Sequence, residues 1–201
     1  GGLSNNSSQT GSLGVGTNAL DSETSGYQNT AFGVNAGTAA TTAHSCTLIG
    51  YQCGDTLTTG QQNTGVGREA FDSLSTGSHN TAVGVKAGGS ITGGSYNVAV
   101  GRNAGKSHTN GDNNTSVGAN AAEHHSSNNN TAIGFQALRG TSGSSTGAHN
   151  TAIGVEALKE NTTGNDNVAC GNALVNNTTG GLNTAVGRAA LYFNTTASHN
   201  T

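Results

Sequence analysis

Large side chains are what this sequence lacks most clearly. It has no proline, tryptophan or methionine, and only 4% of its 201 residues are aromatic. Hydrophobic residues make up 31%, which is too little large apolar surface to fill the core of a compact globule. Charged residues reach only 8%, however, whereas disordered chains are usually rich in charge and proline. We therefore expect an ordered chain built of thin layers.

Charge of one sign and long apolar runs are also missing. The formal net charge of −3 is spread along the chain without a basic stretch, so no nucleic acid is expected as a partner. No stretch approaches the roughly 18 apolar residues of a membrane span, so we expect no membrane insertion. Residues 1–4 do not resemble a signal peptide. Because the last repeat is cut short after Thr201, we expect a segment of a longer fibre.

The three cysteines, Cys46, Cys53 and Cys170, cannot all pair with one another. Cys53 and Cys170 take positions that Ala, Val or Ile occupy in the other repeats described below, so we expect free cysteines that act as small hydrophobic residues. A Cys46–Cys53 disulfide is the alternative. The extended chain between the two residues argues against it, and no other repeat carries the pair.

Glycine is abundant, with 33 residues, and it recurs at a fixed period. The motif Asn80-Thr81-Ala82-Val83-Gly84 recurs along the whole chain. The first six steps between its glycines are 17 residues each, and the later steps are 16, 20, 17 and 16. Such a period predicts a repeat architecture, here a single array over residues 1–201. The motif glycines, taken as position 0 of each repeat, are Gly16, Gly33, Gly50, Gly67, Gly84, Gly101, Gly118, Gly134, Gly154, Gly171 and Gly187.

Position −1 is apolar in every repeat, and position −3 is Thr or Val in all but one. Two β-branched positions one pleat apart indicate a short strand from −4 to −1 with both side chains on one face. We expect that face to point inward as a core seam, with the small residue at −2 facing outward or against a neighbouring chain. The core seam comprises Val15, Phe32, Ile49, Val66, Val83, Val100, Val117, Ile133, Ile153, Cys170 and Val186.

Position −4 is Asn in nine repeats. We expect these side chains to form an amide ladder, each bonding to the copies above and below it, as stacked Asn does in cross-β structure. The alternative is a simple turn former before a strand. The ladder residues are Asn29, Asn63, Asn80, Asn97, Asn114, Asn130, Asn150, Asn167 and Asn183.

Short strands separated by two glycine-marked turn zones predict an all-β fold, a β-solenoid (β-roll) of about eleven 17-residue coils. Coils stacked at roughly 4.7–4.9 Å would make a rod on the order of 50 Å long. A helix is disfavoured by the dense glycine, Asn and Thr. A rod this thin has little core, so we expect copies of the chain to associate side by side, with an end-to-end filament as a further possibility.

The run Asn150-Thr151-Ala152-Ile153-Gly154, followed by Asn161-Thr162-Thr163-Gly164, resembles the repeats of tail-fibre and bacterial surface-fibre proteins, which often end in an intramolecular chaperone domain. More distantly it is similar to the head repeats of trimeric autotransporter adhesins. The resemblance covers essentially the whole chain. It implies a homotrimer of β-rolls and an extracellular, cell-surface or virion location. The 17-residue unit and a strand motif one residue shorter depart from the adhesin pattern.

No combination of side chains indicates catalysis, and we expect no enzyme, no cofactor and no metal site. His79, His149 and His199 share position −5, but the first two are four repeats apart, roughly 19 Å, and cannot share an ion. We expect the seven histidines, including His124-His125, in exposed loops. Segments 110–113 and 164–167 each contain one carboxylate, so they are expected to be turns rather than calcium loops.

Two functions remain. The first is structural: the shaft of an extracellular or virion fibre, such as a tail fibre or an adhesin stalk, which presents a binding tip to a cell-surface receptor or glycan. The alternative is an ice- or glycan-binding solenoid whose Thr ladder at −3 faces outward. Leu13, Val98 and Val168 interrupt that ladder, which favours an inward face. The ladder comprises Thr30, Thr47, Thr64, Thr81, Thr115, Thr131, Thr151 and Thr184.

Overall fold

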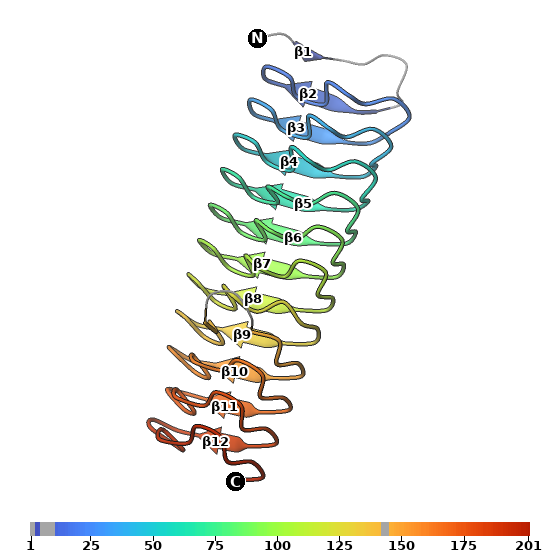
Figure 1. Ribbon diagram of the computed structural model, residues 1–201. Helices are drawn as coiled ribbons and strands as arrows, with labels where there is room; N and C mark the ends of the chain where they lie inside the picture. Colours follow the sequence, from blue (N-terminus) through green and yellow to red (C-terminus); the bar gives the residue numbers. More distant parts are fainter. Residues whose placement is uncertain (1–2, 5–10, 142–144) are drawn as a thin grey trace.

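The computed structural model describes residues 3–4, 11–141 and 145–201, and it is an all-β solenoid of about ten turns without a helix in those residues (Figure 1). The strands form one sheet in sequence order. All neighbouring strands are parallel except β1, which is antiparallel to β2. The strands are β1 (Leu3–Ser4), β2 (Leu13–Val15), β3 (Thr30–Phe32), β4 (Thr47–Ile49), β5 (Thr64–Val66), β6 (Thr81–Val83), β7 (Val98–Val100), β8 (Thr115–Val117), β9 (Thr131–Ile133), β10 (Thr151–Ile153), β11 (Val168–Cys170) and β12 (Thr184–Val186).

Equivalent positions of successive repeats lie directly above one another. In the pair β6–β7, Thr81 faces Val98 and Val83 faces Val100. The same register holds at β9–β10, although the repeat there is 20 residues long, so the additional residues are accommodated outside the strand. The hydrogen-bond ladder extends past the strand, because the Gly84 amide donates to the Val66 carbonyl at 2.8 Å. The position of a residue within its repeat therefore determines its environment along the whole rod.

The motif glycine closes the strand at a sharp corner. Gly67 has a φ of +139°, a backbone conformation that side chains disfavour. A Cβ atom added there would lie 2.5 Å from the carbonyl oxygen of Gly84 in the next coil. The glycine is thus required both by its own dihedral angle and by the close stacking of the corners.

The core occupies the face opposite to the one predicted. Position −2 is fully buried, for example at Ala82 and Ala99, whereas Phe32 at position −1 is 57% exposed and Val186 is 71% exposed. The narrow lumen accepts small side chains from every described parallel strand but β4, where Leu48 is buried, and the larger β-branched residues point to the outside. The predicted core seam is wrong at every position, because none of its residues is buried: Val15, Phe32, Ile49, Val66, Val83, Val100, Val117, Ile133, Ile153, Cys170 and Val186.

The lumen is filled instead from the turn that follows the strand. Position +3 supplies a column of small residues such as Ala70 and Ala87, and positions +4 and +7 supply the large ones. The largest fully buried apolar side chains are Phe71, Leu48, Leu57, Leu74, Ile91, Leu138, Leu158 and Leu174. This is a thin core of the kind that needs stacking neighbours on both sides.

Large and small residues compensate one another within this lumen. Leu48 is the one leucine at position −2, and its methyl groups lie 2.9 and 2.8 Å from where a Cβ of Gly37 and Gly54 would be. Those two glycines occupy position +4, which is Leu in other coils. Leu48 is therefore accommodated because the adjoining positions have no side chain.

Candidate functional site

The amide ladder at position −4 runs through the interior of the rod. Its Asn97 rung is fully buried and donates from Nδ2 to Asn80 Oδ1 at 3.1 Å and to the Gly111 carbonyl at 2.7 Å. In the next coil, Asn114 donates to Asn97 Oδ1 from its backbone amide at 3.0 Å and from Nδ2 at 3.1 Å. The ladder expected from the sequence is thus present as continuous hydrogen bonding between coils. Every residue predicted for it is buried: Asn29, Asn63, Asn80, Asn97, Asn114, Asn130, Asn150, Asn167 and Asn183.

The ladder is broken once, at Cys46. Its backbone amide donates to Asn29 Oδ1 at 3.0 Å, and its thiol contacts the Gly60 carbonyl at 3.5 Å. Cys46 is a free thiol, as is Cys53, so the alternative disulfide between them is absent. Burial raises the pKa of Cys53 to about 12, which makes this thiol a poor nucleophile.

A second polar column, at position −6, escaped the sequence prediction. Ser95 accepts a hydrogen bond from the Ser78 amide at 3.1 Å, and Asp112 Oδ1 accepts one from the Ser95 amide at 2.7 Å. Asn165 likewise accepts from the Ala148 amide at 2.8 Å. The Asp and Asn side chains of segments 110–113 and 164–167 therefore bind the neighbouring coil, in agreement with their interpretation as turns.

The outer face of the sheet carries the candidate functional surface. Side chains at −3, −1 and +1 of each coil point away from the lumen, and we call the surface they form the outer stripe. Most of the exposed large hydrophobic residues of the described chain belong to it: Leu13, Phe32, Val34, Ile49, Tyr51, Val83, Val85, Ile133, Phe135, Ile153, Val155, Val168 and Val186. The outer stripe thus runs from β2 to β12, the full length of the parallel sheet.

The Thr column at −3 forms one border of this outer stripe. Thr30, Thr64 and Thr184 are exposed, and the remaining members of the column are half-buried. The expectation that replacement by Leu13, Val98 and Val168 indicates an inward face is wrong. Leu13 is 46% exposed, and the alternation along each strand places position −3 on the same side as −1.

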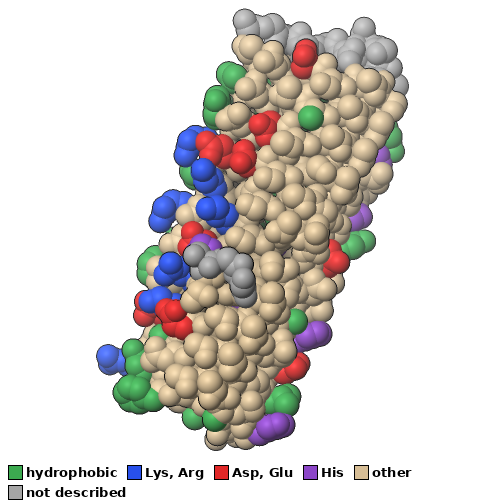
Figure 2. Space-filling view, viewed as in Figure 1, with side chains coloured by type: hydrophobic (Ala, Val, Ile, Leu, Met, Phe, Trp, Pro, Cys, Tyr) green, Lys and Arg blue, Asp and Glu red, His purple; other side chains and the backbone are tan. Residues whose placement is uncertain are grey.

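Charged side chains border the outer stripe on its other side. Lys and Arg residues gather along one long edge of the rod, while the broad face in view is almost uncharged (Figure 2). At this edge Glu69 contacts Arg68 at 2.7 Å and, in the next coil, Lys86 at 3.0 Å. The hydrogen bond from Lys86 and the nearby Arg68 charge hold the pKa of Glu69 below its usual range.

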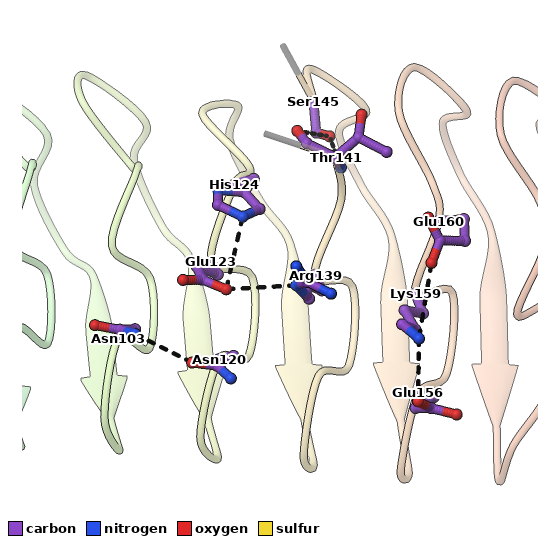
Figure 3. A network of polar contacts seen from close by, with 10 residues as sticks. All are labelled: Asn103, Asn120, Glu123, His124, Arg139, Thr141, Ser145, Glu156, Lys159 and Glu160. Atoms are coloured by element: carbon purple, nitrogen blue, oxygen red, sulfur yellow. Dashed lines mark hydrogen bonds and ion pairs between the residues drawn. The ribbon is translucent and has the colours of Figure 1, made fainter. Parts of the chain in front are cut away.

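Further along the same edge, Glu123 lies 3.4 Å from Arg139 of the following coil and 3.6 Å from His124 (Figure 3). Lys159 lies between Glu156, at 3.1 Å, and Glu160, at 3.8 Å. These half-buried pairs lie at the surface of the rod, where each contributes little to stability individually. They do give the rim alternating positive and negative charges along the rod.

The seven histidines differ in their burial, and two of them, His44 and His124, are half-buried. His79, His149 and His199 are exposed, as expected, and His79 stacks on Tyr96 with ring centroids 4.7 Å apart. His108 and His125 are fully buried, which contradicts the expectation that all seven lie in exposed loops. They occupy position +7 of adjacent coils, a column whose inward orientation could have been read from Leu57, Leu74 and Ile91.

In the part of the chain that the structure describes, no three His, Cys, Asp or Glu side chains come together as a possible metal site. The same residues include no helix long and apolar enough to cross a membrane. A scan against protein-family models and searches of curated proteins and of solved structures find no match to this chain. The outer stripe and the charged rim beside it are therefore the features from which a function has to be inferred.

Proposed function

We propose that the protein is a structural shaft whose copies pack side by side through the outer stripe. The observation that carries this proposal is the column of outward-facing side chains at −1, which is apolar in every repeat. Six of these side chains are exposed and the others are half-buried; the exposed ones are Phe32, Ile49, Val83, Ile133, Ile153 and Val186. Monomeric soluble proteins rarely leave a contiguous apolar surface of more than a few hundred Å² exposed, and larger ones mark interaction sites. A surface that repeats with the period of the rod is best matched by a partner with the same period, namely a second copy.

The dimensions of the outer stripe give the size of the interface that it could form. Eleven stacked strands with three outward columns give a surface on the order of 50 Å by 10 Å. This area, about 500 Å², is smaller than the roughly 800 Å² per partner of a standard protein interface, so the outer stripe alone would form a small one. The charged rim can supply further contacts, because Glu69 at position +2 lies next to the outer stripe, where it contacts Arg68 at position +1. Side-by-side packing would enlarge the core that a single narrow lumen lacks.

The trimer and the location of the shaft are supported by the resemblance to tail-fibre, surface-fibre and adhesin repeats. On that ground the assembly is a homotrimer of parallel rods, extracellular, at a cell surface or on a virion. There it separates a receptor- or glycan-binding tip from its base. A smooth rod of stacked, hydrogen-bonded coils suits such a spacer, because its length is set by the number of repeats.

Two neighbouring substitutions test the packing. Val83 is 37% exposed on the outer stripe, and Ala82 beside it is fully buried in the lumen. Val83→Asp should keep the β-sheet circular dichroism of the parent and reduce its mass in sedimentation equilibrium to that of one chain. Ala82→Asp buries a charge and should unfold the coils around β6. A parent chain that sediments as a monomer, or a Val83→Asp variant that keeps the parent's mass, would contradict the proposal.

An ice- or glycan-binding surface is the second candidate, and the outward position of the Thr column favours it. Thr81, Thr131 and their equivalents present hydroxyl and methyl groups at the regular stacking distance of the coils, roughly 4.7–4.9 Å. The Val or Ile at −1 extends this into a flat, two-column array. A thermal-hysteresis assay at micromolar protein separates the candidates. Activity that Thr81→Lys and Thr131→Lys remove would favour the ice surface, whereas an inactive oligomer would favour the shaft.

A further inference from the structure

The interior column at position +7 changes its chemistry halfway along the rod. In the coils of β4 to β6 it is apolar, and it then becomes imidazole, hydroxyl and amide. The column continues into the later coils, where changes in repeat length shift its numbering: Ser145 lies at +11 of the 20-residue repeat and Asn177 at +6 of the 16-residue repeat. All its members are buried: Leu57, Leu74, Ile91, His108, His125, Ser145, Asn161 and Asn177. The two histidines therefore lie in a closed lumen where the apolar lining gives way to a polar one.

The residues around these histidines are small, and they pack closely against the rings. Gly105 takes position +4 in the coil of His108, and a Cβ there would be 3.0 Å from the His108 ring and 3.3 Å from the Ala99 side chain. Ala99 is paired across the sheet with Ser116, which is fully buried. The buried apolar residues divide at the same level into two clusters, one ending at Ala104 and one beginning at Ala121. The polar groups thus lie between the two apolar clusters, among small side chains.

Four buried polar atoms at this level have no hydrogen-bond partner among the described residues: His108 Nδ1, His108 Nε2, Ser116 Oγ and His125 Nδ1. The remaining imidazole nitrogen, His125 Nε2, lies 3.1 Å from the Asn161 carbonyl oxygen. Since a carbonyl only accepts, Nε2 carries the proton and Nδ1 of the same ring is an acceptor. Leaving such groups unpaired is unfavourable, so native proteins usually satisfy them with protein atoms or ordered water.

We propose that ordered water binds in the lumen between β7 and β8, hydrogen bonded to His108, Ser116 and His125. Neutral imidazoles offer the right partners, because His108 then has one donor and one acceptor and His125 Nδ1 one further acceptor. Burial keeps the rings neutral, lowering the pKa of His108 to about 3 and that of His125 to about 4. Together with the Ser116 hydroxyl they provide the two to four partners that a buried water needs.

A metal ion is the competing ligand, and the observations favour water over it. Only two imidazoles are present, one of which is oriented by its bond to Asn161. Glu123, the nearest carboxylate in sequence, points to the outside and pairs with Arg139 at 3.4 Å. A hydroxyl and two rings without a carboxylate or thiolate make a poor cation site but a good water site. The site lies inside one chain, so it is independent of how copies associate.

The test counts internal water by magnetic relaxation dispersion of water nuclei, on the whole chain and on matched variants. His108→Leu reproduces the side chain that the column carries at Leu57 and Leu74, and it should remove at least one long-lived water. Ile91→Leu, one coil away in the same column, is the control and should leave the number unchanged. If His108→Leu does not fold, Ser116→Ala serves instead, because alanine occupies the same position in most coils.

A crystal structure gives the second measurement. Electron density for water about 2.7–3.2 Å from Ser116 Oγ and from a ring nitrogen of His108 is the expected result. The proposal is overturned if parent and His108→Leu hold the same number of internal waters. It is also overturned if the four atoms bond to one another, or if an anomalous signal identifies a metal ion between the rings.

Discussion

Removing one rung of the amide ladder should weaken the rod far more than removing an asparagine from its surface. In Asn97→Ala the four hydrogen bonds of the Asn97 side chain, two donated and two accepted, disappear. Two buried groups lose the partner that the structure gives them, namely the Asn114 backbone amide and the Gly111 carbonyl. Each such orphan costs about 1–3 kcal/mol, so we expect a loss of about 4 kcal/mol in the free energy of unfolding.

Asn176→Ala is the matched control. Asn176 makes one side-chain bond, to the Tyr192 carbonyl at 3.0 Å, from a partly buried position, and its loss should cost about 1 kcal/mol. The two variants make the same chemical change, so they share the gain in side-chain entropy and the change in composition. Their difference, about 3 kcal/mol, reports the contribution of the ladder.

Two measurements apply to this pair. Urea denaturation followed by circular dichroism compares the unfolding midpoints, with variants of the same array so that the surface exposed on unfolding is alike. Amide hydrogen exchange adds a local readout, because the Asn114 amide should exchange much faster in Asn97→Ala and at the parent rate in Asn176→Ala. Equal midpoints for the two variants, together with an unchanged Asn114 amide, would refute the view that the ladder stabilises the stack.

Three further predictions concern the same stack. Cys46→Asn fills the interrupted rung and should raise the free energy of unfolding by about 1 kcal/mol, measured against Cys46→Ala, which should not. Gly67→Ala should be much more damaging than Gly187→Ala in thermal unfolding, because both have a positive φ but only Gly67 would place its Cβ against the next coil. Burial lowers the pKa of His108 to about 3 and that of His125 to about 4 from 6.5, so the unfolded chain takes up protons first as the pH falls. Stability should be complete above pH 7 and should fall below pH 6.5 by about 1.4 kcal/mol per pH unit and per histidine, a loss that His108→Leu should roughly halve in urea denaturation at pH 5.

The repeat made most of the fold predictable from the sequence. The spacing of the motif glycines predicted the stacking, the positions of the eleven parallel strands and the amide ladder, because in a solenoid each repeat has the same environment as the others. The antiparallel strand β1 lies outside the repeat and was not predicted. Even the 20-residue repeat between Gly134 and Gly154 keeps the strand register. Composition also indicated small residues in the interior, which holds for the Ala columns at −2 and +3 but not for the turn residues such as Phe71 and Leu74.

The orientation of the strand could not be derived in the same way. A three-residue strand has one central and two flanking side chains, and the rule that hydrophobic residues lie inside assigned the two larger ones to the core. That rule fails where the lumen is too narrow for them. The signal that could have decided the matter lies at position +4, where glycine faces Leu48, the one large residue at −2. Such size compensation between distant positions identifies a shared interior.

The outward orientation of position −1 changes what the repeated motif implies about function. Had Val and Ile at −1 filled the lumen, Thr at −3 would have pointed inward with them, and this face of the rod would carry Ala and Asn, a surface with little reason to bind anything. With −1 outward, each added coil adds the same increment of apolar and hydroxyl surface at the same spacing. A ligand that matches this surface must itself be periodic, which leaves another copy of the rod or a crystalline lattice. Val83→Asp should therefore prevent association with either partner while the chain keeps its fold. Ala82→Asp should disrupt both the fold and the association that depends on it.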